Sequence, residues 1–289
     1  MFKGVGTALI TPFKATGEID FPALDKLIDF QLDNGIDALI VLGTTGEPAT
    51  MTSEEREAVM KFAITKVNGR IPVIIGTGCN NTKVMVEYSI IAEQLGADGL
   101  LVVTPYYNKC TQAGLIEHYK AVNSAVQIPI IAYNVPSRTG VNLLPSTYAT
   151  ISKLNNIIAI KEASGDIEQI SEMSRLKSEG TYVYSGDDAI ILPVLSVGGN
   201  GIISVSSNIV PKLVKSITDS FFAGDLETAR AMQHKLSPLV KMIFSEVNPI
   251  PVKMGASILG YCTPTMRLPL TTMTEANAEK LSVILKSLV

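Results

Sequence analysis

Eight short apolar runs recur along the chain, separated by longer stretches of mixed polarity. Each run has four to six residues, and most are rich in valine and isoleucine. Runs this short and this apolar are typical of β-strands whose two faces are both covered. We therefore expect strands at Val5–Ile10, Ala38–Gly43, Pro72–Gly76, Gly99–Thr104, Pro129–Asn134, Ile157–Lys161, Tyr182–Ser185 and Gly201–Val205.

The stretches between these runs show the spacing of amphipathic helices. In the first, apolar residues recur at helical intervals, with Asp20 before them as an N-cap and Gly35 behind them as a stop signal. The second begins with a capping-box pattern at residues 52–55 and ends near Gly69. The third covers about residues 82–95. Strands and helices therefore alternate along the chain.

This alternation is typical of parallel strands joined by helical crossovers. Eight units within residues 1–224 predict an α/β fold, a closed (β/α)8 TIM barrel that forms the catalytic domain. An open doubly wound sheet is the alternative, but no G-x-G-x-x-G pattern follows the first strand. We interpret residues 225–289 as a C-terminal helical extension, because only helical patterns remain there. They are Asp225–Ser245, Val252–Leu259 and Thr274–Leu288.

Composition narrows the class of protein. The 289 residues, 46% of them hydrophobic and 18% charged, are enough for the core of one barrel. A formal net charge of -3 without a basic run argues against a nucleic-acid partner. The one long uncharged run, residues 189–211, is interrupted by glycines, so we expect no membrane span. No apolar leader precedes the first strand. The three cysteines, Cys79, Cys110 and Cys262, are far apart and odd in number, which suits a soluble, cytoplasmic protein.

The sixth apolar run ends in a lysine, Lys161. An ammonium group at the end of a buried strand loses part of its water, and desolvation favours the neutral amine. A neutral amine is a nucleophile that can form a Schiff base with a carbonyl compound. Taken alone, such a lysine more often keeps its head in solvent at the rim of a sheet. Its neighbours in the fold decide between these two interpretations.

Polar residues directly follow most of the predicted strands. In a TIM barrel the carboxyl ends of the strands form one face, where catalytic residues gather. Gly43–Gly46 is either a tight turn or a loop whose backbone N–H groups approach a carboxylate. Tyr133 either packs in the barrel or presents its hydroxyl at this face, and Arg138 is either solvated or clamps a carboxylate. The polar segments are Gly43–Glu47, Thr104–Tyr107, Tyr133–Arg138, Lys161–Glu162, Ser185–Asp188 and Ser204–Ser207.

No pattern for a metal or phosphate site is present in the sequence. The two histidines, His118 and His234, lie in helical stretches far from other candidate ligands. Asp187 and Asp188 are adjacent carboxylates, which alone make a weak metal site. No Gly-Lys-Ser/Thr follows Gly43–Gly46, as it would in a phosphate-binding P-loop. We therefore expect chemistry that needs no metal.

Several motifs together resemble the pyruvate-dependent class I aldolases. The resemblance extends over essentially the whole chain. It implies a TIM barrel whose lysine forms a covalent imine, with no further cofactor. It points most closely to the branch that condenses pyruvate with L-aspartate 4-semialdehyde, the first committed step of lysine (diaminopimelate) biosynthesis. The matching motifs are Gly43–Glu47, Tyr133–Gly140, Ile160–Ala163, Ser185–Asp188 and Asn248–Lys253.

The resemblance implies the roles of the catalytic residues. Lys161 would attack the ketone of pyruvate and form an imine, which loses a methyl proton to give an enamine. The enamine carbon would attack the aldehyde of the second substrate, whose amine then displaces the lysine and closes the ring. Proton transfer needs a positioned relay. The family builds this relay from Thr44, Tyr133 and Tyr107, the last supplied by a neighbouring subunit.

The resemblance also implies how the substrates are bound. Thr45, with Thr44, would hold the pyruvate carboxylate, and Arg138 would hold the carboxylate of the semialdehyde. Backbone groups of Gly186 and Ile203 would line the pocket. Members of the family are usually tetramers built as dimers of dimers, and a shared tyrosine requires at least the dimer. We therefore expect a homo-oligomer of this kind.

Two other functions stay open at this point. N-acetylneuraminate lyase, or another pyruvate-dependent 2-keto-acid aldolase, would share the barrel, the lysine and the tyrosine. Thr45 and residues 137–139 favour the lysine-biosynthetic branch, because a short amino-acid aldehyde needs a cation for its carboxylate. A sugar acid needs hydroxyl-binding groups instead. A non-catalytic barrel that senses a keto acid is the second alternative, and the intact Lys161, Tyr133 and Thr44 argue against it.

One group of residues departs from relatives that L-lysine inhibits. Ser53 and Arg56 stand where inhibited relatives carry histidines, and Val84 stands where they carry a glutamate. Losing a carboxylate and adding a like charge both disfavour a bound lysine, since like charges about 4 Å apart repel by roughly 4 kcal/mol at an effective dielectric constant of about 20. We expect little or no lysine feedback, unless Arg56 turns to solvent and Glu87 substitutes. The positions concerned are Ala49, Ser53, Arg56, Asn80, Val84 and Tyr106.

Overall fold

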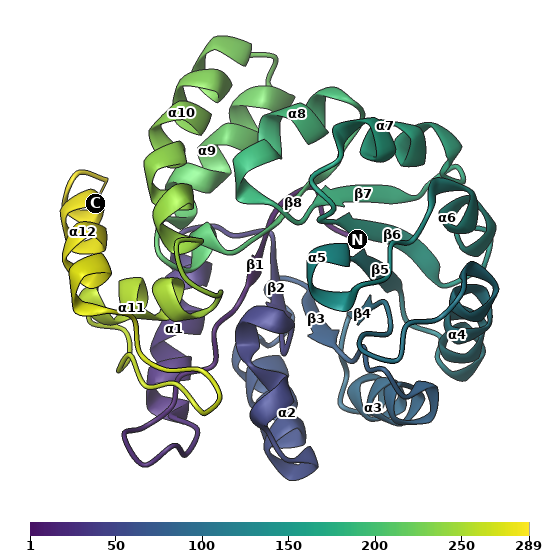
Figure 1. Ribbon diagram of the computed structural model, residues 1–289, viewed down its shortest axis with the longest axis horizontal. Coiled ribbons are helices and arrows are strands. Elements are labelled where there is room, and N and C mark those ends of the chain that lie inside the picture. Colours follow the sequence, from purple (N-terminus) through teal and green to yellow (C-terminus); the bar gives the residue numbers. More distant parts are fainter. Residues whose placement is uncertain (289) are drawn as a thin grey trace.

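The computed structural model describes residues 1–288, in which eight parallel strands close into a barrel. Neighbours in the barrel are neighbours in the sequence, and β8 pairs with β1 to complete the ring (Figure 1). The ends of each strand lie within two residues of the expected run, so the predicted TIM barrel is confirmed. The strands are β1 (Gly4–Ala8), β2 (Ala38–Val41), β3 (Val73–Gly76), β4 (Gly99–Val103), β5 (Ile130–Asn134), β6 (Ile157–Glu162), β7 (Tyr182–Ser185) and β8 (Gly201–Ser204).

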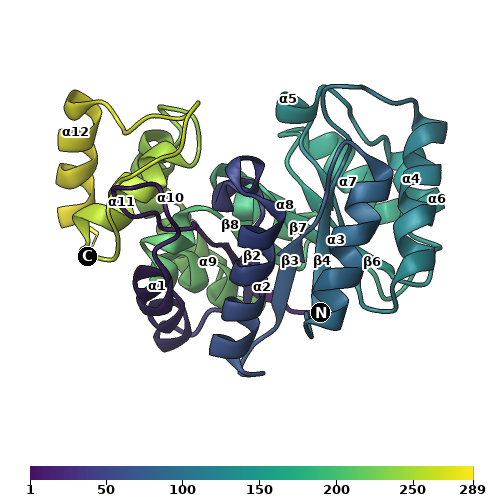
Figure 2. The ribbon, with the colours of Figure 1, turned by 90° about the horizontal axis from the view of Figure 1, so that it is seen from below.

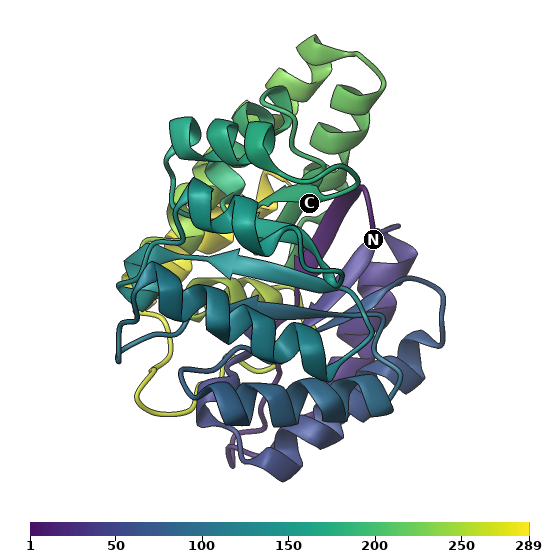
Figure 3. The ribbon, with the colours of Figure 1, turned by 90° about the vertical axis from the view of Figure 1, so that its right-hand side faces the viewer.

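Helices surround the strands on the outside of the barrel (Figure 3). Two of these helices begin at the N-terminal capping residues that the sequence predicts. Asp20 accepts a hydrogen bond from the amide of Ala23, and Thr52 and Glu55 form a complete capping box. None of the described helices is long and apolar enough to cross a membrane. They are α1 (Phe21–Asp33), α2 (Ser53–Val67), α3 (Thr82–Gln94), α4 (Gln112–Ala125), α5 (Pro136–Thr139), α6 (Pro145–Ile151), α7 (Ile167–Leu176), α8 (Ile191–Ser196), α9 (Pro211–Phe222), α10 (Leu226–Ile243), α11 (Ile250–Ile258) and α12 (Glu275–Lys286).

Two layers of apolar side chains hold the barrel together. Alternate strand residues face outward into a large core beneath the helices, and the others face inward and fill the barrel. At the amino ends of the strands, the ring of Phe2 stacks on that of Tyr184 with centroids 4.4 Å apart. The Tyr184 hydroxyl also donates to the Phe2 carbonyl. Because Phe2 fills this end of the interior, the opposite, carboxyl end is where polar side chains can gather.

The helices α10, α11 and α12 form a C-terminal extension beside the barrel (Figures 1 and 2). Helix α10 packs against α9 and α12, and α11 packs against α12. The segment between α11 and α12 returns to the barrel, where the Arg267 guanidinium donates to the carbonyls of Gly17 and Thr50. Arg267 also forms a salt bridge with Glu55 of α2. The extension therefore contacts the loop after β2, at the carboxyl face of the barrel.

Candidate active site

A cavity of about 410 Å³ lies at the carboxyl ends of the strands, between the barrel and the end of α10. Its walls come from β5, β6, the loops after β2, β5 and β7, and the C-terminal extension. Segments far apart in the sequence therefore meet in one place. Six of the predicted site residues line this cavity, namely Thr44, Thr45, Tyr133, Arg138, Lys161 and Gly186.

Lys161 lies on β6 with only 5% of its surface exposed. It pairs in the sheet with Tyr133 of β5, and its Nζ atom lies 4.4 Å from the centre of the Tyr133 ring. Burial lowers the pKa of Lys161 to about 8; the Asp188 carboxylate opposes this shift and the Arg138 guanidinium adds to it. About a tenth of the amine is therefore neutral at pH 7, and this fraction is nucleophilic.

Gly186, in the loop after β7, leaves the space that the lysine occupies. A Cβ atom at this position would lie 3.0 Å from Cε of Lys161 and 2.7 Å from Cβ of Ala163. Both distances are shorter than ordinary van der Waals contact. A larger residue here would displace the Lys161 side chain, which explains why the polar segment after β7 contains a glycine.

Tyr133 lies beside the lysine, and Thr44 lines the same cavity. Burial raises the pKa of the Tyr133 phenol, whereas the Arg138 guanidinium and the Thr44 hydroxyl oppose this shift. The phenol therefore keeps its proton at neutral pH. Thr44 begins the 3-10 helix η1 (Thr44–Gly46), two residues after Leu42, whose φ is 58°. A leucine in the left-handed region is strained, and strain of this kind concentrates at functional sites.

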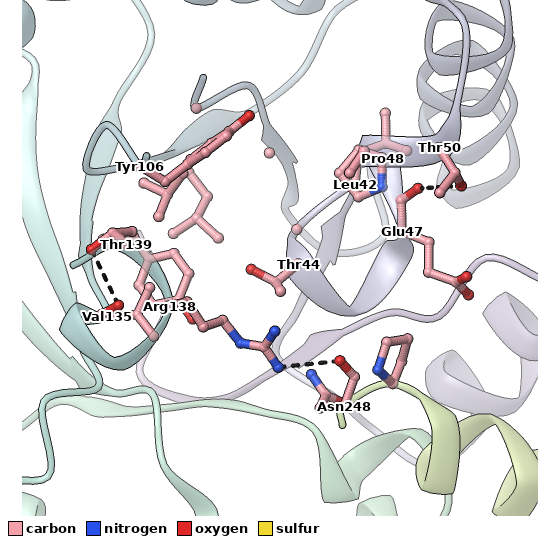
Figure 4. A pocket seen from close by; sticks show the side chains of 18 of the residues that line it. Leu42, Thr44, Glu47, Pro48, Thr50, Tyr106, Val135, Arg138, Thr139 and Asn248 are labelled. Atoms are coloured by element: carbon pink, nitrogen blue, oxygen red, sulfur yellow. Dashed lines mark hydrogen bonds between the residues drawn. The ribbon is translucent and has the colours of Figure 1, made fainter. Parts of the chain in front are cut away.

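Asn248 is not among the site residues predicted from the sequence, but it contacts two that are, Arg138 and Thr45. Its backbone carbonyl accepts from Nη2 of Arg138 at 3.1 Å, and its side-chain amide donates to Oγ1 of Thr45 at 3.0 Å. Figure 4 shows the Arg138 side chain reaching toward Asn248. Thr45 and Asn248 are 203 residues apart in the chain, so no local pattern could reveal this contact. Its only sequence signal was the motif in the C-terminal tail.

Asp188, one of the residues considered as a metal ligand, is instead hydrogen-bonded within the protein. Asp188 is fully buried and accepts from the Ser204 hydroxyl and from the amides of Val205 and Ser206. Burial raises the pKa of Asp188, and these hydrogen bonds oppose the shift. Within residues 1–288, no three His, Cys, Asp or Glu side chains come together in a way that could hold a metal ion. Asp188 instead places negative charge near the lysine.

Two predicted site residues lie outside the cavity. Tyr107, in the loop after β4, has a φ of 71°, and 91% of its surface is exposed. Ile203, on β8, is fully buried among the side chains that fill the barrel. Within one chain, therefore, the phenol of Tyr107 is not part of the group around Lys161.

A second cavity of about 350 Å³ adjoins the first and shares Arg138 and Asn248 with it (Figure 4). Of the residues expected at a regulatory site, Ala49, Arg56 and Tyr106 line this cavity. The other three, Ser53, Asn80 and Val84, lie outside its lining.

Arg56 is held beside this second cavity. Its Nε and Nη2 atoms donate to the Pro48 carbonyl at 3.0 and 2.6 Å, and its guanidinium carbon lies 4.7 Å from the centre of the Tyr88 ring. The alternative in which Arg56 turns to solvent is therefore wrong. Glu87, which that alternative required as a substitute, forms an exposed pair with Lys83 at 3.9 Å.

The fold and the cavity together define a class of protein. A TIM barrel that carries a buried, partly neutral lysine at its carboxyl face supports carbonyl chemistry through a lysine imine, as in class I aldolases. The model of one protein family, the dihydrodipicolinate synthetase family, matches residues 1–288.

Individual relatives agree with this family. The 4-hydroxy-tetrahydrodipicolinate synthase of Alkaliphilus oremlandii is 54% identical over 281 residues, which cover 97% of each chain. The crystal structure of dihydrodipicolinate synthase from Aquifex aeolicus superimposes with a TM-score of 0.97 at 47% identity, covering 99% of this chain and 98% of that one. The chloride-inhibited dihydrodipicolinate synthase of Acinetobacter baumannii, complexed with pyruvate, reaches 0.97 at 39% identity over 100% of both chains.

The chain thus belongs to the dihydrodipicolinate synthetase family. Its activity is that of a 4-hydroxy-tetrahydrodipicolinate synthase, a lyase of the class I aldolase type that carries out a step of lysine biosynthesis. The family and the reaction expected from the sequence are confirmed.

Proposed function

We propose that Lys161 carries pyruvate as a covalent imine, which the cavity then condenses with L-aspartate 4-semialdehyde. The observation that carries this proposal is the burial of a lysine with a pKa of about 8 in a cavity that also contains Arg138. The amine attacks the ketone carbon, and water leaves as the C=N bond forms. The pyruvate complex of the Acinetobacter relative supports this first substrate.

The later steps need protons to move at the bound carbon and nitrogen atoms. The imine is an electron sink, so a methyl proton leaves and the resulting enamine carbon attacks the aldehyde carbon. Tyr133 is the group we assign to these transfers, because Nζ of Lys161 lies over its ring and burial keeps its phenol protonated. The phenol gives its proton to the hydroxyl that leaves as water during imine formation, and the resulting phenolate then accepts the methyl proton. The Thr44 hydroxyl passes the proton on. Attack by the amine of the second substrate on the imine carbon then closes the ring and releases the lysine.

Two groups in the cavity suit the two substrate carboxylates. We assign the pyruvate carboxylate to the hydroxyls of Thr45 and Thr44, which line the cavity with Lys161. Arg138 suits the carboxylate of the semialdehyde, because a guanidinium donates two parallel hydrogen bonds to a carboxylate. The backbone of Gly186, which approaches the lysine closely, lines this pocket. The resemblance assigns the backbone of Ile203 on β8 to the same pocket, although its side chain is buried inside the barrel.

Imine formation should follow the titration of Lys161. Because the neutral amine is the nucleophile and its pKa is lowered to about 8, the rate of imine formation with pyruvate should rise with pH through a midpoint near 8 and level off at higher pH. Arg138→Gln removes a positive charge that lowers this pKa, so the midpoint should move to higher pH. Rapid trapping with borohydride over a pH series measures both curves. A midpoint near the ordinary lysine value of 10.5 in the unchanged protein would contradict the lowered pKa.

Turnover separates this function from the alternatives. The protein given pyruvate and L-aspartate 4-semialdehyde should consume both and release 4-hydroxy-tetrahydrodipicolinate, which mass spectrometry detects. Cleavage of N-acetylneuraminate without turnover of the semialdehyde would overturn the proposed second substrate. Pyruvate binding with no turnover of either compound would support a sensor instead.

We also propose a cytoplasmic homo-oligomer in which Tyr107 of one chain completes the proton relay of another. Its support is the large exposed ring held outward on a left-handed backbone, away from the cavity of its own chain. A tetramer built as a dimer of dimers is the assembly that the family resemblance implies. Sedimentation velocity should show this tetramer, and Tyr107→Phe should lower kcat without changing the sedimentation coefficient. A fully active monomer would exclude the shared relay.

L-Lysine at submillimolar concentration should leave the activity unchanged. The positive charge of Arg56 is fixed beside the second cavity by the Pro48 carbonyl and the Tyr88 ring, and Val84 offers no carboxylate to balance an added ammonium group. Steady-state rates with and without lysine measure this directly. The double variant Arg56→His with Val84→Glu should become sensitive. Half-inhibition of the unchanged protein by submillimolar lysine would show that the expectation is wrong.

A further inference from the structure

Asn248 lies where the C-terminal extension meets the barrel, and it lines both cavities. It is 7% exposed, and its partner Thr45 is 3% exposed. The backbone carbonyl of Asn248 holds Arg138, whereas the side-chain amide holds the Thr45 hydroxyl. One residue of the extension thus contacts both groups to which we assign a substrate carboxylate.

The side-chain contact determines which way the Thr45 hydroxyl points. A threonine hydroxyl donates one proton and accepts through its lone pairs. Because Nδ2 of Asn248 donates to Oγ1 at 3.0 Å, the hydroxyl cannot donate back to the same nitrogen. Its proton is left to donate toward the cavity that Thr45 lines. A donor aimed into the cavity is what a bound carboxylate requires.

Stability does not account for an asparagine at this position. Its Oδ1 atom is buried and has no hydrogen-bond partner among residues 1–288. The cost of burying an unpaired acceptor equals or exceeds what a single hydrogen bond returns. A residue that brings such a cost to the cavity of the reacting lysine points to a role in function rather than in folding.

We propose that Asn248 is a positioning residue for pyruvate, whose amide holds the Thr45 hydroxyl as a donor to the pyruvate carboxylate. The proposal rests on the functions assigned above to Lys161 and Thr45. The contact with Arg138 comes from the backbone of Asn248, so it persists when the side chain is replaced. The site of the second substrate should therefore be unaffected by such a replacement.

Three variants test this role. Asn248→Ala should raise the KM for pyruvate about threefold to tenfold, the effect of one hydrogen bond, and leave the KM for the semialdehyde and the Tm nearly unchanged. Asn248→Asp should raise the pyruvate KM further, because its carboxylate accepts the Thr45 proton and repels the substrate. Asn277→Ala is the matched control: its amide donates to Oε1 of Glu246 at 2.7 Å, away from the cavity lining, and both KM values should stay as they are.

A double-mutant cycle completes the test. With Thr45→Val present, Asn248→Ala should add nothing to the pyruvate KM, since the hydroxyl through which it acts is gone. Equal rises in both KM values, an unchanged pyruvate KM, or an Asn248→Asp variant no worse than Asn248→Ala would overturn the proposal. If the unchanged protein forms no borohydride-trapped pyruvate adduct, the proposed function of Lys161 fails. If it forms one and the variants bind pyruvate equally well, the role of Asn248 alone fails.

Discussion

Lys161→Ala should lower kcat/KM for both substrates by at least about 10³-fold, the range of effects seen when a group essential to the chemistry is removed. The alanine leaves the carboxylate sites in place but removes the amine that turns pyruvate into an electron sink. Steady-state turnover of pyruvate and L-aspartate 4-semialdehyde measures the loss. The unfolding midpoint should not fall, because burial already disfavours the charged lysine at this position.

Two further variants make this result specific. Lys161→Arg keeps a positive charge but not a nucleophilic amine, so it should be as inactive as the alanine variant. Burial also lowers the pKa of Lys177, which lies outside both cavities, and Lys177→Ala should keep normal activity. A Lys161→Ala protein with more than about a tenth of the normal kcat would argue against covalent catalysis through this residue.

Lys253→Met should destabilise the protein by about 3–5 kcal/mol, because it removes one partner of a buried ion pair and leaves the other in place. Lys253 is fully buried and pairs with Glu47, which is 4% exposed. It also donates to the Thr265 carbonyl at 3.2 Å, and its Nζ lies 4.3 Å from the centre of the Phe13 ring. Burial raises the pKa of Glu47, and the charge of Lys253 opposes that shift. Without the lysine, an uncompensated carboxylate stays in the core.

Urea denaturation followed by circular dichroism measures this destabilisation. The double variant Glu47→Gln with Lys253→Met should recover much of the loss, and Lys120→Met, at an exposed pair with Glu117, should change the midpoint little. The single variant should regain stability as the pH falls toward 4.5, the ordinary pKa of a glutamate, because its folded state binds the proton more tightly than its unfolded state. Equal destabilisation of the single and double variants would contradict a charge effect.

The barrel was predictable because its strands are buried on both faces and its helices carry local end signals. The run from Ile157 to Lys161 shows no polar interruption, and the Asp20 cap lies next to its helix in the sequence. Strand ends were less predictable. The expected second strand continued to Gly43, whereas β2 ends at Val41 because Leu42 turns into the left-handed region. A leucine gives no sequence signal for such a conformation.

The inner part of the candidate site was predictable for a topological reason. Tyr133, Lys161 and Gly186 each lie at or just after the carboxyl end of a strand, and parallel strands bring these ends to one face. The contacts of the extension could not be derived in this way. Lys253 and Glu47 are 206 residues apart, and their pairing depends on how α11 returns to the barrel. The exposure of Tyr107 likewise follows from a backbone conformation that a tyrosine does not signal.

A mass spectrum tests the role of Lys161 most directly. The protein is incubated with pyruvate, reduced with borohydride and digested, and the modified peptide is sequenced. We expect one reduced pyruvate adduct per chain, on the peptide that contains Lys161, and none when pyruvate is omitted. No adduct, or an adduct on another lysine such as Lys177 or Lys253, would contradict the proposed mechanism.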